Sequence, residues 1–245
     1  MSQGRHGIKI LGLALLAAVS VMAVTAASAM ATGEYKLEAK TFTAAGLAKE
    51  SVAGTGGLGI LLVPAIKLEL HCTGADVTSS TVLLGGVAHA TVLFLGCTVL
   101  KNSFCHVYPT KAEAEKDSGT GLGDITASGL GLLRLHGSPV VHYLEVEGPE
   151  GGTKPFTTIF FGGAECTLPI ENKVTGKTAF KLPGALTPAV NQTLESINEA
   201  TGTLLGVQLK FGLNNAFIHG GTFATPTTAS VHLSGANVGK TWGSE

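Results

Sequence analysis

Alternating apolar and polar residues mark strands in the stretch between residues 66 and 105. In the run IKLELHC at 66–72, apolar residues alternate strictly with polar ones, and the run ends on Cys72. Successive side chains of a strand point to opposite faces, so this run predicts a strand that is buried on one face. The run TVLFLGC at 91–97 is apolar on both faces, and CHVYP at 105–109 begins with a cysteine. The pattern therefore predicts strands whose ends are held by sulfur.

Glycine-rich turns divide the rest of the chain into similar short runs. The chain has 34 glycines, often in pairs, and the runs between them are rich in Val, Ile, Leu, Thr and Phe. Short strands at close spacing are typical of an all-β fold, and we predict a sandwich or a flattened barrel, stapled by disulfides. Residues 140–163 also predict a hairpin, with the sequence PEGGTK at 149–154 as its loop.

One segment carries the signals of a short helix. In TPAVNQTLESINEATG at 187–202, Thr187 suits the N-cap, Pro188 the first helical position and Gly202 the C-terminal end. Three apolar residues between them fall near helical spacing. We therefore predict one helix here, and we expect it to pack on the sheet because a helix this short is not stable alone.

The first 31 residues have the three parts of a secretory signal peptide. Arg5 and Lys9 precede an uncharged apolar run at 10–24, and small residues follow, with Ala29 and Ala31 at the two key positions of an A-x-A site. This predicts a signal peptide over 1–31 and a mature chain from Thr32. The apolar run is shorter than the ~18–20 residues of a membrane span. Cleavage after Ala29 and an uncleaved N-terminal anchor remain the alternatives.

The rest of the chain, residues 32–245, suits a single β-rich domain. Without Arg5 and Lys9, the 16 basic residues fall to 14, against 17 acidic ones. No basic patch is present, so we expect no nucleic-acid partner and no attraction to anionic lipid. No later apolar run reaches spanning length, so we expect no membrane span after signal removal. These features predict a secreted or cell-surface protein that is an envelope component or binds a protein partner.

Four cysteines in an exported chain favour disulfides over metal ligands, because no C-x-x-C and no paired histidines occur. The spacing favours Cys97–Cys105, joined across a short turn, together with Cys72–Cys166. The alternative is Cys72–Cys97 with Cys105–Cys166, and the sequence leaves the connectivity open. We expect no metal and no cofactor.

The order of these cysteines resembles that in a known group of proteins. The features are a strand ending in Cys72, the sequence GCT containing Cys97, then Cys105, and a GGA-x-C strand containing Cys166. They resemble a group of small exported proteins of high-GC Gram-positive bacteria, over roughly residues 66–168. The resemblance implies export and a β-rich fold. It implies no activity, ligand or catalytic residue.

No residue set predicts catalysis. The chain has no G-x-S-x-G nucleophile elbow, and we interpret His219–Gly220–Gly221 as a tight turn. Glu145, Glu147 and Glu150 indicate a solvated acidic face, with a weak calcium site as the next interpretation.

Histidines alternate with apolar residues in several predicted strands. We expect most of them on solvent-facing positions, His142 among them. Strand alternation places His142 on the face opposite to Glu145 and Glu147, so these residues cannot share a proton on a regular strand.

The sequence therefore predicts an exported, non-enzymatic envelope or extracellular protein with a structural or binding role. The alternative is a secreted hydrolase whose site is assembled from distant strands.

Overall fold

The chain divides into two compact units, Met1–Ala31 and Thr32–Glu245. The boundary falls where the sequence predicts the end of the signal peptide, but residues 1–30 lie outside the described part. The computed structural model describes residues 31–38, 40–43, 49–101, 104–118, 123–183, 187–219 and 228–245.

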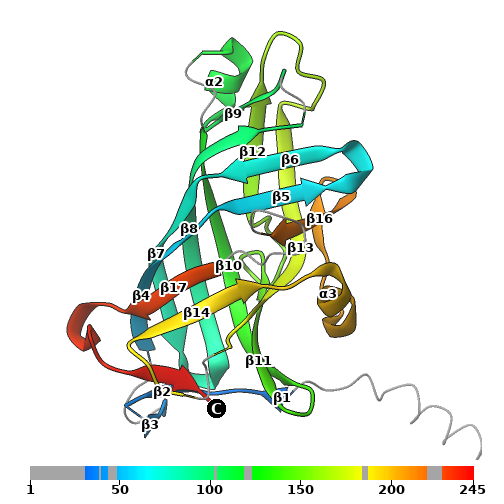
Figure 1. The fold of residues 1–245 in the computed structure, drawn as a ribbon. Helices are drawn as coiled ribbons and strands as arrows, with labels where there is room; N and C mark the ends of the chain where they lie inside the picture. Colours follow the sequence, from blue (N-terminus) through cyan, green and yellow to red (C-terminus); the bar gives the residue numbers. More distant parts are fainter. Residues whose placement is uncertain are drawn as a thin grey trace, which may run out of the picture. The chain divides into compact units, whose positions relative to one another are not determined.

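Strands dominate the second unit, which confirms the all-β prediction (Figure 1). Their bounds are β1 (Ala31–Thr32), β2 (Tyr35–Leu37), β3 (Lys40–Thr41), β4 (Lys49–Gly56), β5 (Gly59–Val63), β6 (Leu68–Cys72), β7 (Gly74–Leu83), β8 (Val87–Val99), β9 (His106–Tyr108), β10 (Gly123–His136), β11 (Val141–Glu147), β12 (Thr157–Gly162), β13 (Glu171–Lys181), β14 (Asn191–Ser196), β15 (Leu209–Phe211), β16 (Asn214–His219), β17 (Thr228–Leu233) and β18 (Trp242–Ser244). The strands β18, β2 and β3 form a small sheet of their own, and the others form one large sheet.

The large sheet closes on itself because β10 pairs with both β8 and β11. Five positions in the ring are each shared by two short strands of the same direction: β4 with β5, β7 with β6, β11 with β12, β14 with β15, and β17 with β16. The order around the ring is β8, β10, β11/β12, β13, β14/β15, β17/β16, β4/β5, β7/β6 and back to β8. All neighbours in the ring are antiparallel, and they follow one another along the chain except where β17/β16 closes the ring on β4/β5. The closed ring corresponds to the barrel alternative of the predicted fold.

The predicted hairpin at 140–163 is wrong, because β11 and β12 do not pair with each other. Both pair with β13, β11 along residues 177–181 and β12 along residues 171–174. Phe156 bridges the neighbouring strands: its N–H donates to the Val174 carbonyl and its carbonyl accepts from the Ser128 N–H, both at 2.8 Å. The PEGGTK segment is thus looped out of one strand position. A turn-rich segment is compatible with either arrangement, and only the partner strand decides between them.

The helix predicted at 187–202 is also wrong over most of its length. Residues 191–196 form β14, which pairs with β17 over five residues. The helix α3 (Glu199–Leu205) begins only afterwards, where the Asn198 side chain accepts from the Thr201 N–H at 2.9 Å. Cross-strand pairing in a closed sheet outweighs the local helix signals.

A second short helix, α2 (Lys111–Lys116), is capped by Thr110. Single 3-10 turns are η1 (Pro64–Ile66), η2 (Leu84–Gly86) and η3 (Gly235–Asn237). Across the described ranges, no helix is long and apolar enough to cross a membrane.

The disulfides are Cys72–Cys97 and Cys105–Cys166, so the favoured pairing is wrong and the alternative is found. Cys72 ends β6 and lies beside Cys97 of β8, with a Cα–Cα distance of 4.0 Å. The chain after Cys97 does not turn back on β8. It enters β9, which pairs with β12 and so brings Cys105 to Cys166. Strand pairing, rather than closeness in sequence, sets the connectivity. Two disulfides indicate an oxidising environment for this unit.

Two buried clusters occupy the two ends of the closed sheet. We name the first the disulfide-end core; it consists of Val63, Leu68, Leu70, Cys72, Cys97, Val99, Cys105, Val107, Ile125, Ile159, Phe161, Val174, Leu209, Phe211 and Ala216. We name the second the termini-end core; it consists of Tyr35, Leu37, Phe42, Val52, Val82, Ala88, Leu133, Leu182, Val231, Leu233 and Trp242. In Figure 1 the strands β9 and β12 lie toward the top, and β2, β3 and β18 lie at the foot of the drawing.

Candidate functional site

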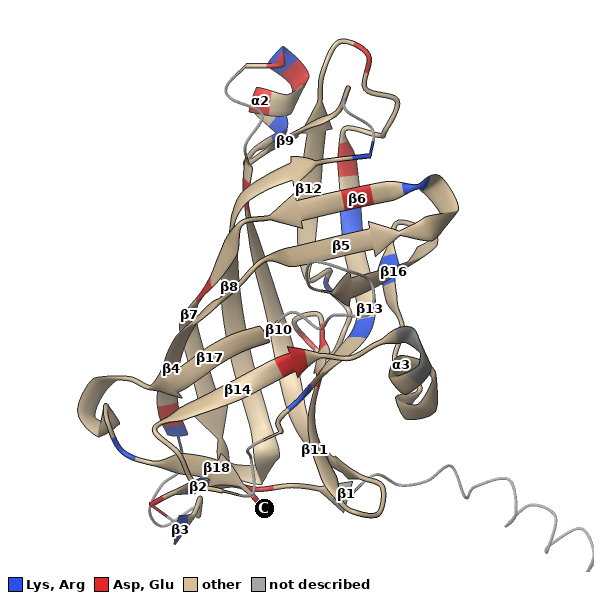
Figure 2. Cartoon of the chain, viewed as in Figure 1, with Lys and Arg blue, Asp and Glu red and all other residues tan. Residues whose placement is uncertain are grey.

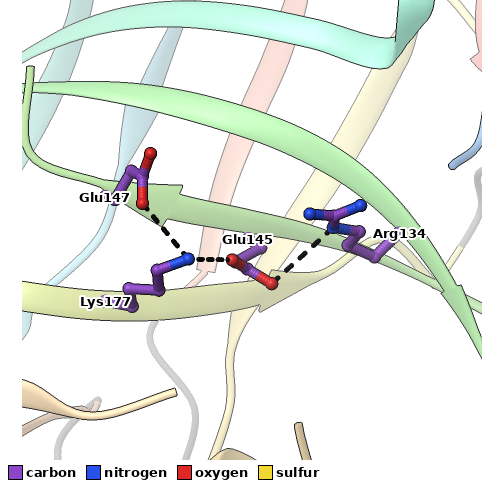
Figure 3. Close-up of polar contacts among 4 residues, drawn as sticks. All are labelled: Arg134, Glu145, Glu147 and Lys177. Carbon is purple, nitrogen blue, oxygen red and sulfur yellow. Dashed lines mark hydrogen bonds and ion pairs between the residues drawn. The ribbon is translucent and has the colours of Figure 1, made fainter. Parts of the chain in front are cut away.

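Two of the three acidic residues singled out in the sequence, Glu145 and Glu147, lie in an ion-pair group on the outer face of β11 (Figure 3). The Lys177 Nζ lies 2.8 Å from a carboxylate oxygen of Glu145 and 3.2 Å from one of Glu147. The Arg134 Nε lies 3.7 Å from the other oxygen of Glu145. Two carboxylates thus face two cations across β10, β11 and β13, and the group carries no net charge.

This arrangement neutralises its members instead of preparing them for catalysis. The hydrogen bond to Glu145, with a further contribution from Glu147, raises the pKa of Lys177, although partial burial opposes the shift. Lys177 therefore stays charged at neutral pH and cannot serve as a base. Glu150 lies apart, paired with Lys154 at an exposed turn. Each glutamate that suggested a calcium site has a lysine partner, and in the described part of the chain no three His, Cys, Asp or Glu residues gather as metal ligands do.

His142 lies on the opposite face of β11 from Glu145 and Glu147, as strand alternation predicts. Its neighbours on that face, Leu144 and Val146, line the interior of the closed sheet. The expected solvent-facing position is wrong, because His142 is only 2% exposed. Its Nδ1 lies 2.7 Å from the Ser244 hydroxyl of β18, and burial lowers the pKa of the imidazole. His142 thus joins the ring to the C-terminal strand.

His219 is the last residue of β16. Gly220 and Gly221 lie outside the described residues, so the tight turn predicted there stays a prediction.

The interior of the ring holds an apolar cavity of about 210 Å³. It adjoins the disulfide-end core through Leu70, Cys72 and Ile125, and it extends toward the other end past Leu144 and Leu194. Small residues from neighbouring strands form part of its wall: Gly56, Ala75, Ala90, Ala127, Gly129 and Ala229.

Strand register explains why space is left at this point. Gly56 pairs with Ala229 on one side and with Ala75 on the other, and Gly129 pairs with Ala90. Short side chains therefore lie beside short side chains on the wall of the interior. A closed sheet of eight positions is just wide enough to be filled by side chains or to hold one small ligand. Because small residues occupy these inward positions, side chains do not fill the interior and space for one small ligand remains.

None of the described residues that line the cavity has a charged side chain. Its polar residues are Ser128, Thr157, Thr178 and Thr228. The Ser128 hydroxyl lies 3.3 Å from that of Thr91, its partner across the strands, so it belongs to the outer face. Thr157 and Thr178 share their faces with the lining residues Ile159 and Phe180. A hydroxyl needs a neighbouring base to become a nucleophile, and the described wall supplies none.

Sequence reasoning missed this cavity. A signal was present, since small residues recur at alternate positions in VAHAT around Ala90 and in ITASG around Ala127. Alternate small residues on two strands indicate an underfilled interior only when the strands are known to be neighbours whose small residues share one face of a closed sheet. That knowledge comes from the pairing of β8 with β10.

Charged residues are distributed thinly over the strands. In Figure 2 lysines and arginines are interspersed with acidic residues, and in this view no strand carries a long run of one sign. The cavity is therefore the distinctive chemical feature of the described residues.

Comparisons with known proteins identify no relative of this chain. No family model matches the chain, and no curated protein or solved structure is significantly similar to it. Function is therefore inferred from the geometry of the site.

Proposed function

We propose that this protein is an exported, non-enzymatic binding protein of the envelope or extracellular space, and that its cavity holds one small apolar molecule. The observation that supports the proposal is the cavity of about 210 Å³, whose described lining residues include no charged side chain. An apolar pocket with a few polar groups is the usual form of a small-molecule site.

Energetics support a ligand in this space. Unfilled apolar space deprives the surrounding side chains of packing contacts, and the cost grows with its volume. A bound apolar molecule restores much of the lost contact, so occupancy stabilises the fold.

Export is supported by two independent features. The sequence of residues 1–31 has the three parts of a signal peptide. Both disulfides are of the kind that persists in oxidising compartments. N-terminal sequencing of the native protein should find Thr32 or Met30 first. Recovery of intact Met1 from the cytoplasm would contradict export.

The non-enzymatic assignment is supported by the position of the charged residues around β11, which lie outside the cavity. The carboxylates of β11 lie on its outer face and are compensated by Lys177 of β13 and Arg134 of β10. A hydrolase would need titratable groups in contact within the pocket. A screen of esterase, glycosidase and peptidase substrates, repeated with Glu145→Gln and Glu147→Gln, should show no turnover. Turnover by the wild type that disappears in either variant would contradict the non-enzymatic assignment and place an active site on the outer face of β11.

Calorimetric titration with 1-octanol tests the binding function directly. The wild-type protein should bind one equivalent, and Ala127→Phe, which fills the cavity, should weaken binding by at least about tenfold because it displaces several buried methylenes. The matched control is Thr126→Phe, which adds the same ring to the exposed face of the same strand. It should bind octanol as the wild type does. No octanol binding by the folded wild type would overturn the proposed function.

A further inference from the structure

The wall of the cavity also limits the kind of molecule that it can take. We infer that the site selects uncharged molecules with a hydrocarbon body of about eight carbon atoms, and that it rejects carboxylates such as fatty-acid anions. This inference rests on the proposed binding function and makes it more specific.

The first support is the absence of a counter-charge among the described lining residues. The lysines next to lining residues on β13 and β15, namely Lys173, Lys177, Lys181 and Lys210, fall on the opposite face of their strands by alternation. Lys177, and Arg134 of β10, are in addition engaged by Glu145 (Figure 3). A carboxylate inside the ring would be buried without a partner, which costs far more than a methylene gains.

The second support is the limited polar capacity of the interior. Thr157 and Thr178 are among the lining residues, but almost all of the cavity surface is apolar. A neutral alcohol, ketone or ester leaves only a few acceptor positions unpaired in such an interior. An ionised carboxylate has about four acceptor sites and a full charge, and this wall cannot replace its hydration.

The third support is size. An apolar cavity of about 150 Å³ takes benzene, with six carbons. By proportion, about 210 Å³ takes about eight carbons. The walls supply both aliphatic and aromatic side chains, including Phe94 and Phe180.

A pair of ligands that differ only in charge tests the selection. The probes are 1-octanol and octanoic acid, titrated into the intact oxidised protein between pH 4.5 and 7.3. A site that takes only neutral acid should bind octanoic acid tenfold more weakly for each pH unit above the pKa of the ligand. With a carboxyl pKa of about 4.3, the loss reaches about 1,000-fold at pH 7.3. Octanol affinity should not change over this range.

The two failures are distinguishable. If octanol binds and octanoate at pH 7.3 binds within tenfold of it, the selection for neutral molecules is wrong while the binding function stands. If neither ligand binds at any pH, the proposed function itself fails.

A series of 1-alkanols tests the size. Affinity should rise about fourfold per added methylene, as complete burial of each one implies, and should level off near eight carbons. An unbroken rise to dodecanol would overturn the size limit.

Discussion

The two ends of the closed sheet are held together by different means. The disulfide-end core contains three of the four bridged cysteines, and the fourth, Cys166, packs against it. The termini-end core contains no cysteine and is covered by the small sheet of β2, β3 and β18.

Hydrogen bonds and aromatic contacts hold the termini end. Trp242 of β18 exchanges backbone hydrogen bonds with Ala189, and its carbonyl accepts from the Gln192 side chain at 2.5 Å. Its ring lies 6.4 Å from that of Tyr35. One end is thus fixed covalently and the other by segments that meet only after the chain has folded. The cavity lies in the ring to which both ends contribute, so each end can be perturbed separately.

The largest effect is expected at the termini end. Trp242→Ala should lower the free energy of unfolding by about 3–5 kcal/mol, because the side chain is 3% exposed and central to its cluster. Denaturant unfolding measures the loss. Val238→Ala, at an exposed residue of the same region, should cost less than about 0.5 kcal/mol. Similar losses in both variants would show that β18 does not close this end.

A slightly smaller effect is expected from removing one bridge at the other end. Cys72→Ala with Cys97→Ala opens a loop with a sequence separation of 25, worth about 3.5 kcal/mol on the chain-entropy estimate. Because the two clusters share no residue, the loss should add to that of Trp242→Ala within about 0.5 kcal/mol. A larger coupling in unfolding experiments would contradict the separation of the two ends.

The outer ion-pair group should matter less than either end. Glu145→Gln should destabilise the fold by about 1–2 kcal/mol, a value reduced from that of a fully buried pair because Lys177 is partly exposed. Glu150→Gln, in the exposed pair with Lys154, should cost no more than about 0.5 kcal/mol. Chemical denaturation compares the two. Equal losses would mean that burial of Glu145 contributes nothing.

The smallest expected effect is a loss of stability in acid that arises at the termini end, where His142 is buried. Burial lowers the pKa of His142 below its unfolded value of about 6.5, so the unfolded chain binds more protons below that pH. The stability contributed by neutral His142 is present above about pH 6.5. It is lost as the pH falls toward the lower folded pKa, by at most about 1.4 kcal/mol per pH unit.

His142→Gln should remove this part of the pH dependence, measured as unfolding free energy between pH 5 and 7.5. His106→Gln, at a half-exposed position near the disulfide end, should leave it in place. Hydrogen exchange at pH 5 should quicken in β18 and β2 before it does in β6 and β8. If the dependence of the unfolding free energy on pH is the same in His142→Gln as in the wild type, His142 is not the group responsible.

The sequence could predict elements whose pattern is local. The alternation in 66–72 predicted a half-buried strand, and β6 shows the expected alternate burial at Leu68, Leu70 and Cys72. The oxidised state of the cysteines also followed from the sequence, because it depends on compartment and composition more than on geometry.

Other features had local signals that favoured the wrong outcome. Residues 191–196 follow a good helix start, yet they form a strand because β17 offers a row of backbone partners. Cys97 and Cys105 are close in sequence, yet the chain between them passes from β8 to β9, a strand that pairs with β12.

By itself, the sequence determined the strand period, the all-β class and the disulfide chemistry, since each depends on neighbouring residues or on composition. Only the tertiary structure decided which cysteines pair, that the sheet closes, and that Gly56, Ala75, Ala90 and Gly129 face one interior. The physical reason is that a side chain's face is set by local backbone geometry, whereas its neighbour across the sheet is set by register between distant segments. The cavity exists only in that register.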